Sequence, residues 1–208
     1  MKLKRYRIAE LLLCGLLLLG GAVSAAGNSG VYTKIIRLHV VANSDGAADQ
    51  TVKLTVRDAL LRETETLLAD ASDRDSAEEI LKASLPALTE KASAVAAAEG
   101  FPYGASLSLQ KEYFPTRNYG EVTLPAGEYT ALRVELGEAA GQNWWCVLYP
   151  PLCLAAAAAP SEKPDPTGEL LEAGLTKDET AVIVGDPGET TVRFRFKLLE
   201  FLGGLFGK

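Results

Sequence analysis

The sequence has a single histidine, His39, so the side chains that build most metal centres are scarce. One histidine excludes the zinc motif H-E-x-x-H and every multi-histidine metal site. The chain also lacks a G-x-S-x-G nucleophile elbow, a phosphate-binding P-loop and a dinucleotide glycine motif. The turn at Asn43–Gly46 has the residue types of a calcium loop, but the first and last ligand positions fall on Val41 and Val52, which cannot coordinate calcium. We therefore predict neither a metal nor a cofactor.

Positive charge is also in short supply. The chain has 21 Lys and Arg against 27 Asp and Glu, a formal net charge of -6. Four of the bases but one acid lie in residues 1–25, so the remaining chain has 17 bases, 26 acids and a charge of -9. Such an acidic body argues against binding nucleic acid or anionic lipid through bulk electrostatics. Its length suits one domain with a real core.

Residues 1–25 have the order of a secretory signal peptide. Four basic residues precede an apolar stretch, Ile8–Leu19, and small residues then lead to a cleavage site at Val23–Ala25. The alternative is an uncleaved N-terminal anchor, although the apolar stretch is short against the roughly 20 residues that span a bilayer. Cys14 follows Leu13 inside the apolar stretch, which does not suit a lipidated cysteine. We expect export with cleavage near Ala25, or membrane association through this segment.

The stretch Lys34–Leu61 predicts a strand, a turn and a helix. Ile36, Leu38 and Val40 alternate with Arg37 and His39, the pattern of a half-buried strand. The turn formers Asn43, Ser44, Asp45 and Gly46 follow, and we expect Ser44 or Asp45 to cap the helix while Asp49 suits its N-terminal dipole. An apolar stripe at helical spacing then packs back on the strand; its members are Val52, Val56, Ala59 and Leu60.

The rest of the chain predicts two more helices and then a run of strands. One helix starts at Ser76 and breaks at Pro86, and the next ends before Gly100. Strands follow from Ala105, at 129–135 and at 144–149, with a loop at 115–120; we expect the last two strands to form a hairpin with a mobile tip. One strand, three helices and a mainly antiparallel run of strands indicate a single α+β domain.

We divide the chain into four segments. Residues 1–25 form the leader and residues 31–154 the α+β core. Residues 155–191 are rich in Ala, Pro and acids, and we expect a flexible insertion with a short helix at 169–175 and few core contacts. In residues 192–208, Val, Phe and Phe alternate with Arg, Arg and Lys, which predicts a final strand followed by a short apolar helix.

Cys146 and Cys153 are the two cysteines that follow the leader. In an exported protein we favour a disulfide between them over free thiols. A cysteine nucleophile paired with His39 is the one enzymatic arrangement left to consider, and it would need a reduced thiol.

Two regions are candidates for binding a partner. Trp144 and Trp145 point to opposite faces of a strand, so one belongs to the core and the other is a possible exposed anchor. Arg37 and His39 share a strand face near the polar turn, as a surface ion pair or as recognition residues. The predicted partner-binding residues are Arg37, His39, Asn43, Ser44, Asp45, Asp49, Trp144 and Trp145.

Two runs resemble one protein family. RLHVVANSDGAADQTVKLTVRDALL is similar to the opening of the stage II sporulation protein R family, and 124–153, with its QNWWCVL and PPLC core, resembles the same family more specifically. The resemblance implies a signalling protein, not an enzyme, that the forespore secretes into the intermembrane space. There it would trigger a membrane-embedded protease of the mother cell, which matures a sigma-factor precursor. The alternatives are a secreted module that binds the cell envelope and a Cys-dependent secreted hydrolase.

Overall fold

The computed structural model describes residues 29–153 and 166–184. The predicted leader at 1–25 and the predicted final strand and helix at 192–208 lie outside the described residues, so both stay predictions.

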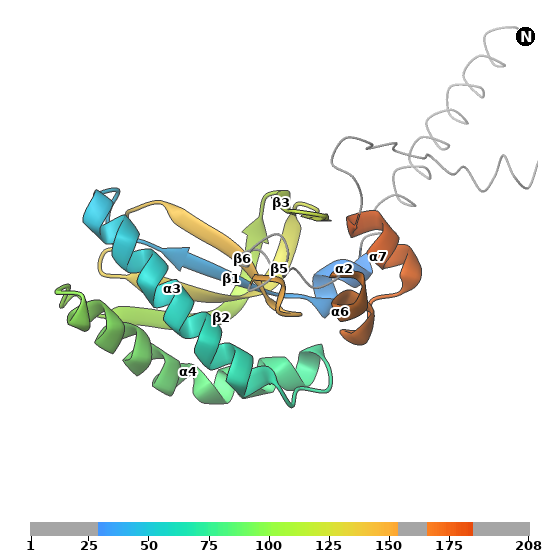
Figure 1. The fold of residues 1–208 in the computed structure, drawn as a ribbon, viewed down its shortest axis with the longest axis horizontal. Helices are drawn as coiled ribbons and strands as arrows, with labels where there is room; N and C mark the ends of the chain where they lie inside the picture. The colour runs from blue at the N-terminus through green and yellow to red at the C-terminus, as the bar shows by residue number, and fades with distance from the viewer. Residues whose placement is uncertain (1–28, 154–165, 185–208) are drawn as a thin grey trace, which may run out of the picture.

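A four-stranded sheet with the strand order β2-β5-β1-β6 forms the centre of the described chain (Figure 1). Its strands are β1 (Ile36–Val41), β2 (Ala105–Phe114), β5 (Gly127–Leu136) and β6 (Asn143–Tyr149). β1 and β5 are parallel, whereas β2 pairs with β5, and β6 with β1, in the antiparallel sense. This mainly antiparallel sheet and the helices packed on it confirm the predicted α+β class.

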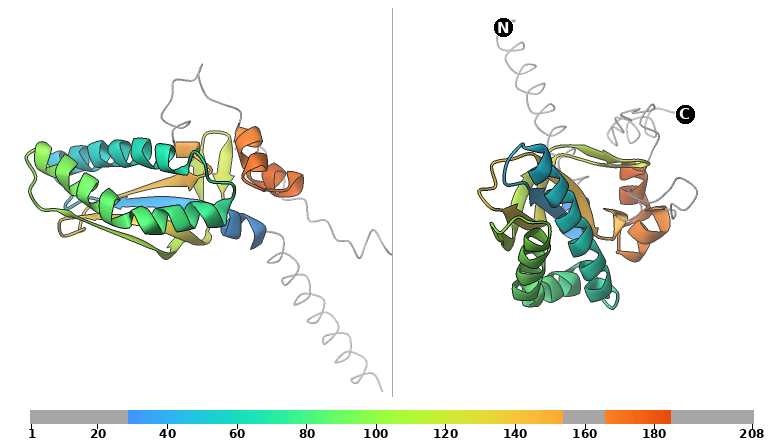
Figure 2. Two further views of the ribbon diagram at one scale, coloured as in Figure 1. Left: turned by 90° about the horizontal axis from the view of Figure 1, so that it is seen from below. Right: turned by 60° about the vertical axis from the view of Figure 1, so that its left-hand side comes forward.

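Two long helices cover one face of the sheet. α3 (Ala47–Leu68) and α4 (Arg74–Ala98) lie side by side along it and bury the larger apolar cluster (Figure 2). A second apolar cluster lies on the opposite side, towards the end of the sheet where β1 begins. Its elements are α2 (Ser29–Lys34), β3 (Arg117–Tyr119), β4 (Val122–Leu124), α6 (Pro166–Glu172) and α7 (Lys177–Ile183).

β1 is buried on both faces, which corrects the prediction of a half-buried strand. All six of its residues are buried. Ile36, Leu38 and Val40 belong to the cluster beneath α3 and α4. Arg37 and His39 point to the other face and are 0% and 2% exposed, because aromatic side chains cover them. The alternation in the sequence is real, but it separates two buried environments of a central strand.

α4 continues through Pro86, so the predicted helix break is wrong. The helix runs without interruption from Arg74 to Ala98, with Pro86 exposed on its outer side. A proline in a helix removes one backbone hydrogen bond and crowds the preceding turn. Here Leu81 and Leu88, on either side of the proline, are both fully buried against the core. Packing on both sides therefore keeps one helix where the sequence predicted two.

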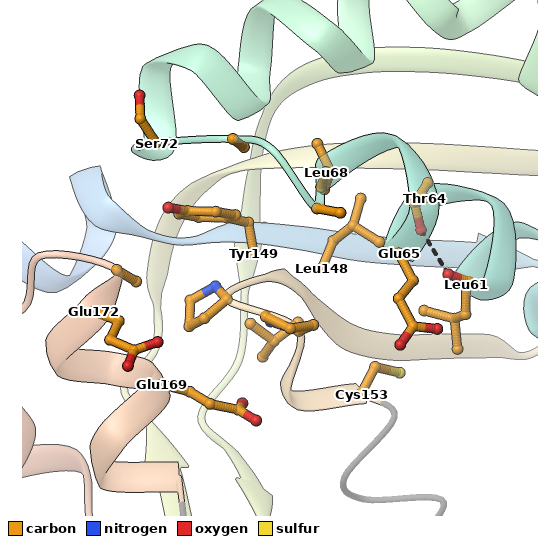
Figure 3. Close-up of a pocket in the computed structure, with 16 residues that line it drawn as sticks. Leu61, Thr64, Glu65, Leu68, Ser72, Leu148, Tyr149, Cys153, Glu169 and Glu172 are labelled. Carbon is orange, nitrogen blue, oxygen red and sulfur yellow. Dashed lines mark hydrogen bonds between the residues drawn. The ribbon is translucent and has the colours of Figure 1, made fainter.

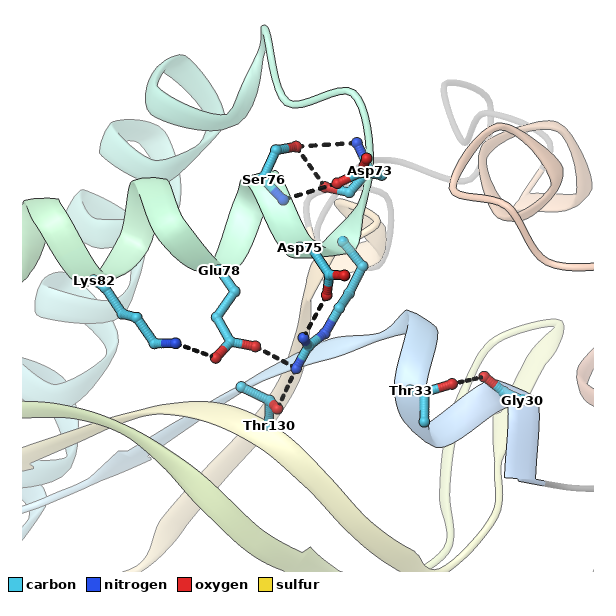
Figure 4. A network of polar contacts seen from close by, with 9 residues as sticks. Gly30, Thr33, Asp73, Asp75, Ser76, Glu78, Lys82 and Thr130 are labelled. Carbon is cyan, nitrogen blue, oxygen red and sulfur yellow. Dashed lines mark hydrogen bonds and ion pairs between the residues drawn. The ribbon is translucent and has the colours of Figure 1, made fainter.

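The start of α4 is fixed by a capping box and by contacts with the sheet (Figure 4). The Asp73 carboxylate accepts a hydrogen bond of 2.8 Å from the Ser76 backbone N–H, and Ser76 Oγ accepts one of 3.1 Å from the Asp73 N–H. Arg74 donates to Thr130 of β5 and pairs with Glu78 one turn along the helix. These contacts join the beginning of α4 to the centre of the sheet.

β5 and β6 do not form the predicted hairpin, because β1 lies between them. The connection at 137–142 therefore crosses the end of β1. The Gly141 N–H donates to the Ala42 carbonyl at 2.9 Å and the Ala140 N–H to the Asn43 carbonyl at 3.1 Å. The predicted loop at 115–120 also contains strand β3, which pairs with β4.

α6 and α7 correct the expectation of few core contacts for the described part of 155–191. Leu170, Leu175 and Ile183 are 0%, 3% and 1% exposed and belong to the second apolar cluster. α7 starts with a capping box in which Thr176 and Glu179 bond to each other's backbone N–H groups. Residues 154–165 and 185–191 lie outside the described residues.

Candidate functional site

Asp49 is the centre of a hydrogen-bonded corner where β1 ends and α3 begins. The Asn43 amide donates to Asp49 Oδ2 at 2.9 Å, the Ser44 hydroxyl donates to the same oxygen, and the Tyr103 hydroxyl donates to Oδ1 at 3.0 Å. The bonds from Ser44 and Asn43 lower the pKa of Asp49 below its ordinary value. Burial, with the Asp49 charge beside it, raises the pKa of Tyr103 to about 12. The structure thus brings Asn43, Ser44 and Asp49 together.

The predicted side-chain cap of α3 is absent. The N-cap is Gly46, and the helix start has no side-chain cap hydrogen bond. Ser44 Oγ accepts a hydrogen bond of 3.1 Å from the Gly46 N–H. The Ser44 hydroxyl donates its own hydrogen bond to Asp49 Oδ2 and does not cap the helix. Asp45 points to solvent. The carboxylate in the first turn of the helix therefore orders the corner, in place of a cap at its start.

The connection at 137–142 closes over this corner. The Glu138 N–H donates to Asn43 Oδ1 at 2.9 Å, and the Lys53 ammonium donates to the Gln142 carbonyl at 3.1 Å. Burial is the main reason that the pKa of Lys53 falls below its ordinary value, and the nearby Arg57 charge adds to it. The predicted mobile tip is thus bonded to rigid elements on both sides.

His39 lies in a polar network on the sheet face that faces away from α3 and α4. Its Nδ1 is 2.8 Å from Glu112 Oε1, and its Nε2 is 2.7 Å from Asn143 Oδ1. Arg133 donates to the same Glu112 oxygen at 2.7 Å and also pairs with Glu135 at 2.8 Å. The network links β1, β2, β5 and β6, so it holds the four strands in register.

Arg37 is a buried cation surrounded by aromatic rings, not a surface ion pair. Its guanidinium carbon is 4.3 Å from the centre of the Phe114 ring, 5.0 Å from that of Tyr129 and 5.4 Å from that of Tyr119. Nε donates to the Cys146 carbonyl at 2.9 Å and Nη2 to the Tyr119 hydroxyl, while Nη1 has no hydrogen-bond partner among the described residues. Burial lowers the pKa of Arg37. Its role in the fold is therefore structural.

The two tryptophans have different surroundings. Trp145 lies on the face of His39, with the two rings stacked and their centres 3.9 Å apart, and the edge of Phe114 adds a second ring contact at 4.8 Å. Trp144 is 36% exposed and lies under the guanidinium of Arg57, 4.1 Å from its ring centre. Neither is fully buried, but Trp144 is the one that presents aromatic area to solvent.

Cys146 and Cys153 are joined in a disulfide, with their Cα atoms 5.6 Å apart. Cys146 pairs with Leu38 across the strands and shares the apolar cluster beneath the helices. His39 points to the other face of the sheet. The cysteine–histidine pair that a thiol nucleophile would need is therefore not assembled.

Within residues 29–153 and 166–184, no group of three or more His, Cys, Asp or Glu side chains is placed to hold a metal ion. In the same residues, no helix combines the length and the apolar character needed to cross a membrane.

Several residues of these networks were not singled out from the sequence. They are Tyr103, Glu112, Arg133, Asn143 and Tyr119. Each lies on a strand or loop far from β1 and Asp49 in the sequence. Glu112, Arg133 and Asn143 meet His39 because β5 and β2 lie on one side of β1 and β6 on the other. Strand alternation puts Arg133 on one face of its strand, but it cannot say which strand lies beside it.

Comparisons with known proteins agree on one family. The model of the family "Stage II sporulation protein R (spore_II_R)" matches residues 32–159. The chain belongs to the stage II sporulation protein R family. It is 35% identical over 181 residues to stage II sporulation protein R of Bacillus subtilis (strain 168), which covers 82% of this chain and 81% of the relative. No solved structure matches. The family resemblance of the two sequence runs is thereby confirmed. Both runs include strands of the central sheet, and the first also includes most of α3.

Proposed function

We propose that this protein is a secreted signal between the two compartments of a sporulating cell. The forespore exports it into the intermembrane space, where it activates a membrane-embedded protease of the mother cell, and that protease processes a sigma-factor precursor. Membership of the stage II sporulation protein R family carries the proposal. The leader order of residues 1–25 supports the export step.

The geometry of the described residues supports binding to a partner in place of catalysis. Trp144 and Asp45 expose their side chains, and Asn43 and Ser44 lie half-buried beside them at the same end of β1. All four project from rigid elements or from the bonded corner, an arrangement that suits recognition. Asp49 holds Asn43 and Ser44 in place through its hydrogen bonds. We assign His39 a positioning role as well, because it bonds to Asn143, the residue before Trp144. Arg37 lies nearer the start of β1, where it is packed among aromatic rings, so we no longer place it at this surface. Trp145 is positioned by its stack on His39.

The test is reconstitution of the mother-cell protease and its sigma-factor precursor in liposomes, with precursor cleavage measured against the concentration of added protein. Trp144→Ala should raise the concentration for half-maximal cleavage about thirtyfold, the loss expected of an aromatic anchor worth about 2 kcal/mol. Its melting temperature should stay near that of the wild type. Tyr113→Ala is the matched control, since Tyr113 is 66% exposed on β2 at the other edge of the sheet. Absence of cleavage with the wild-type protein contradicts the proposal.

A double variant separates signalling from thiol chemistry. Cys146→Ser with Cys153→Ser should keep full activation, because neither sulfur takes part in recognition. The cost is loop entropy of about 2–3 kcal/mol in unfolding free energy. Loss of activation without loss of fold would favour the Cys-dependent hydrolase. Retention on peptidoglycan with no effect on the protease would favour the envelope-binding module.

A further inference from the structure

β6 is an edge strand whose outer side has no partner strand in the part of the chain that the structure describes. One side of β6 pairs with β1 from Asn143 to Tyr149, and β6 is last in the strand order. The outward N–H and C=O groups of an edge strand are a template for one more strand, and proteins usually cover such an edge.

Two cavities of opposite charge follow this edge. The first, of about 610 Å³, lies beside Asn143–Cys146, and the described residues that line it include Arg57 and Arg117 but no carboxylate. The second, of about 350 Å³, lies beside Val147–Tyr149, and its lining in the described part of the chain has carboxylates but no Lys or Arg (Figure 3). Its three carboxylates are those of Glu65, Glu169 and Glu172. Arg57 is already paired with Asp58 at 2.6 Å, so the charge left for an incoming carboxylate is chiefly that of Arg117. The edge therefore has a basic half and an acidic half, which continue into each other because Leu61 and Cys153 line both cavities.

One carboxylate of the acidic half lacks a partner. Glu169 Oε2 is buried and has no hydrogen-bond partner among the described residues. Burial raises the pKa of Glu169, and the neighbouring charge of Glu172 adds to the effect. A basic side chain entering this cavity would supply the missing partner, since buried carboxylates are stable only when paired or hydrogen-bonded.

The described chain ends beside the basic half of the edge. Val184 forms an antiparallel bridge with Val122 of β4, and Val122 is paired with Tyr119 of β3. Tyr119 and Gly120 line the arginine cavity. Residues 185–208 follow Val184, so they start close to the arginine cavity, and five extended residues reach as far as about 17 Å.

The sequence after Val184 carries the charges in the matching order. The acids Asp186 and Glu189 come first, and Val192, Phe194 and Phe196 then alternate with Arg193, Arg195 and Lys197. Glu189 and Arg193 are four residues apart, about 13 Å along a strand, which equals the step from Asn143 to Val147 on β6. A strand laid beside β6 in the same direction brings the acid to Arg57 and Arg117, and the bases to the carboxylates.

We propose that residues 189–197 of this chain add to the free edge of β6 as a fifth strand, with Glu189 at the arginine cavity and Arg193 and Arg195 at the carboxylate cavity. The charge order of the two cavities and the position of Val184 carry this assignment, which does not depend on the signalling role. In this arrangement the chain protects its own edge strand from pairing with other chains.

Hydrogen–deuterium exchange of the full chain tests the proposal. Arg193→Glu with Arg195→Glu should speed the exchange of amides in 143–149 about tenfold, because their outward N–H groups lose a partner strand. Exchange in β1 and in β2, the opposite edge, should stay unchanged and so reports that the fold is intact. Lys82→Glu with Lys91→Glu on α4 is the control, since it changes the total charge equally at a distance from both cavities.

A charge swap makes the test specific. Adding Glu169→Arg and Glu172→Arg to the tail variant should restore slow exchange at 143–149, because the two new pairs have the opposite polarity. Four results would overturn the proposal. Two are equal exchange of β6 in the wild type and the tail variant, and no rescue by the swap. The third is protection that rises with protein concentration, which would assign the edge to a second copy, and the fourth is protection that appears only with the protease present, which would assign it to that partner.

Discussion

His39 and Trp145 lie opposite each other on neighbouring strands with their rings stacked, 3.9 Å between centres and 12° between planes. Glu112 and Asn143 bond to the two ring nitrogens of His39, so the indole of Trp145 packs against an imidazole whose orientation is fixed. Trp144, the preceding residue, points to the other face, contacts the guanidinium of Arg57 and is 36% exposed. Trp145 is therefore part of the fold, whereas Trp144 presents part of its ring to solvent, as the proposed partner-binding role requires.

The tryptophan pair should separate in stability measurements. Trp145→Ala should lower the free energy of unfolding by about 2–4 kcal/mol, because it removes a half-buried indole and two ring contacts. Trp144→Ala should cost less than about 1 kcal/mol, since over a third of that side chain is already in water. Urea unfolding of both variants gives the values. Equal losses would mean that both rings belong to the core and would remove Trp144 as an anchor.

Arg37 should tolerate an apolar residue of similar length better than a small one. Arg37→Ala should cost about 3–5 kcal/mol, because it leaves a cavity among three aromatic rings and unpaired groups on Cys146 and Tyr119. Arg37→Met fills most of that volume and has no charge to desolvate, so it should be more stable than Arg37→Ala by at least about 1 kcal/mol. Thermal melting and urea unfolding decide. A methionine variant no better than alanine would show that the charge itself stabilises the site.

Gly141 is required by the close approach of the crossing connection to the corner. A Cβ placed there would lie 2.2 Å from the Ser44 carbonyl oxygen, which is backbone and cannot rotate away. Gly141→Ala should therefore cost about 2 kcal/mol or more and weaken activation with it. Gly168→Ala is the control: no atom of the described residues lies within 4 Å of its added Cβ, and alanine in α6 should stabilise by up to about 1 kcal/mol. Equal melting temperatures for both variants would contradict this packing.

The sequence predicted the individual helices and strands better than it predicted which strands lie side by side in the sheet. The strand at 36–41, the helix with Asp49 in its first turn and the strand at β6 follow from periodicity and turn residues, which are local signals. Pro86 misled because tertiary packing outweighs a helix breaker when both flanking turns are buried. The hairpin of β5 and β6 was wrong because two strands close in sequence are separated by β1, which is far away in the sequence.

In the candidate site too, contacts between residues close in the sequence were predicted, whereas contacts between distant residues were not. Asn43, Ser44 and Asp49 are within seven residues of each other, and the turn pattern brought them together correctly. Burial of Arg37 and His39 depends on Phe114, Trp145 and the β3–β4 hairpin. Nothing local to β1 indicates those partners, so both residues were expected at the surface.

Asp49 should make the stability of the protein depend on pH in the acid range. Its folded-state pKa lies below its ordinary value of about 4, because Ser44 and Asn43 donate to the carboxylate. For a lowered pKa, the stabilisation is complete above the unfolded-state pKa and is lost as the pH falls through the folded-state value. Wild-type protein should therefore be more stable than Asp49→Asn by a constant amount between pH 5 and 7, and the difference should shrink below about pH 4.

Urea unfolding at pH 7, 5, 4 and 3 measures this difference. Asp45→Asn is the control, since that carboxylate is exposed four residues earlier in the same corner, and its difference from the wild type should stay small at every pH. Tyr103→Phe removes one donor to Asp49 without changing the ring, so it should reproduce part of the Asp49→Asn effect. A difference between wild type and Asp49→Asn that is the same at pH 3 and pH 7 would show that the carboxylate charge does not order the corner.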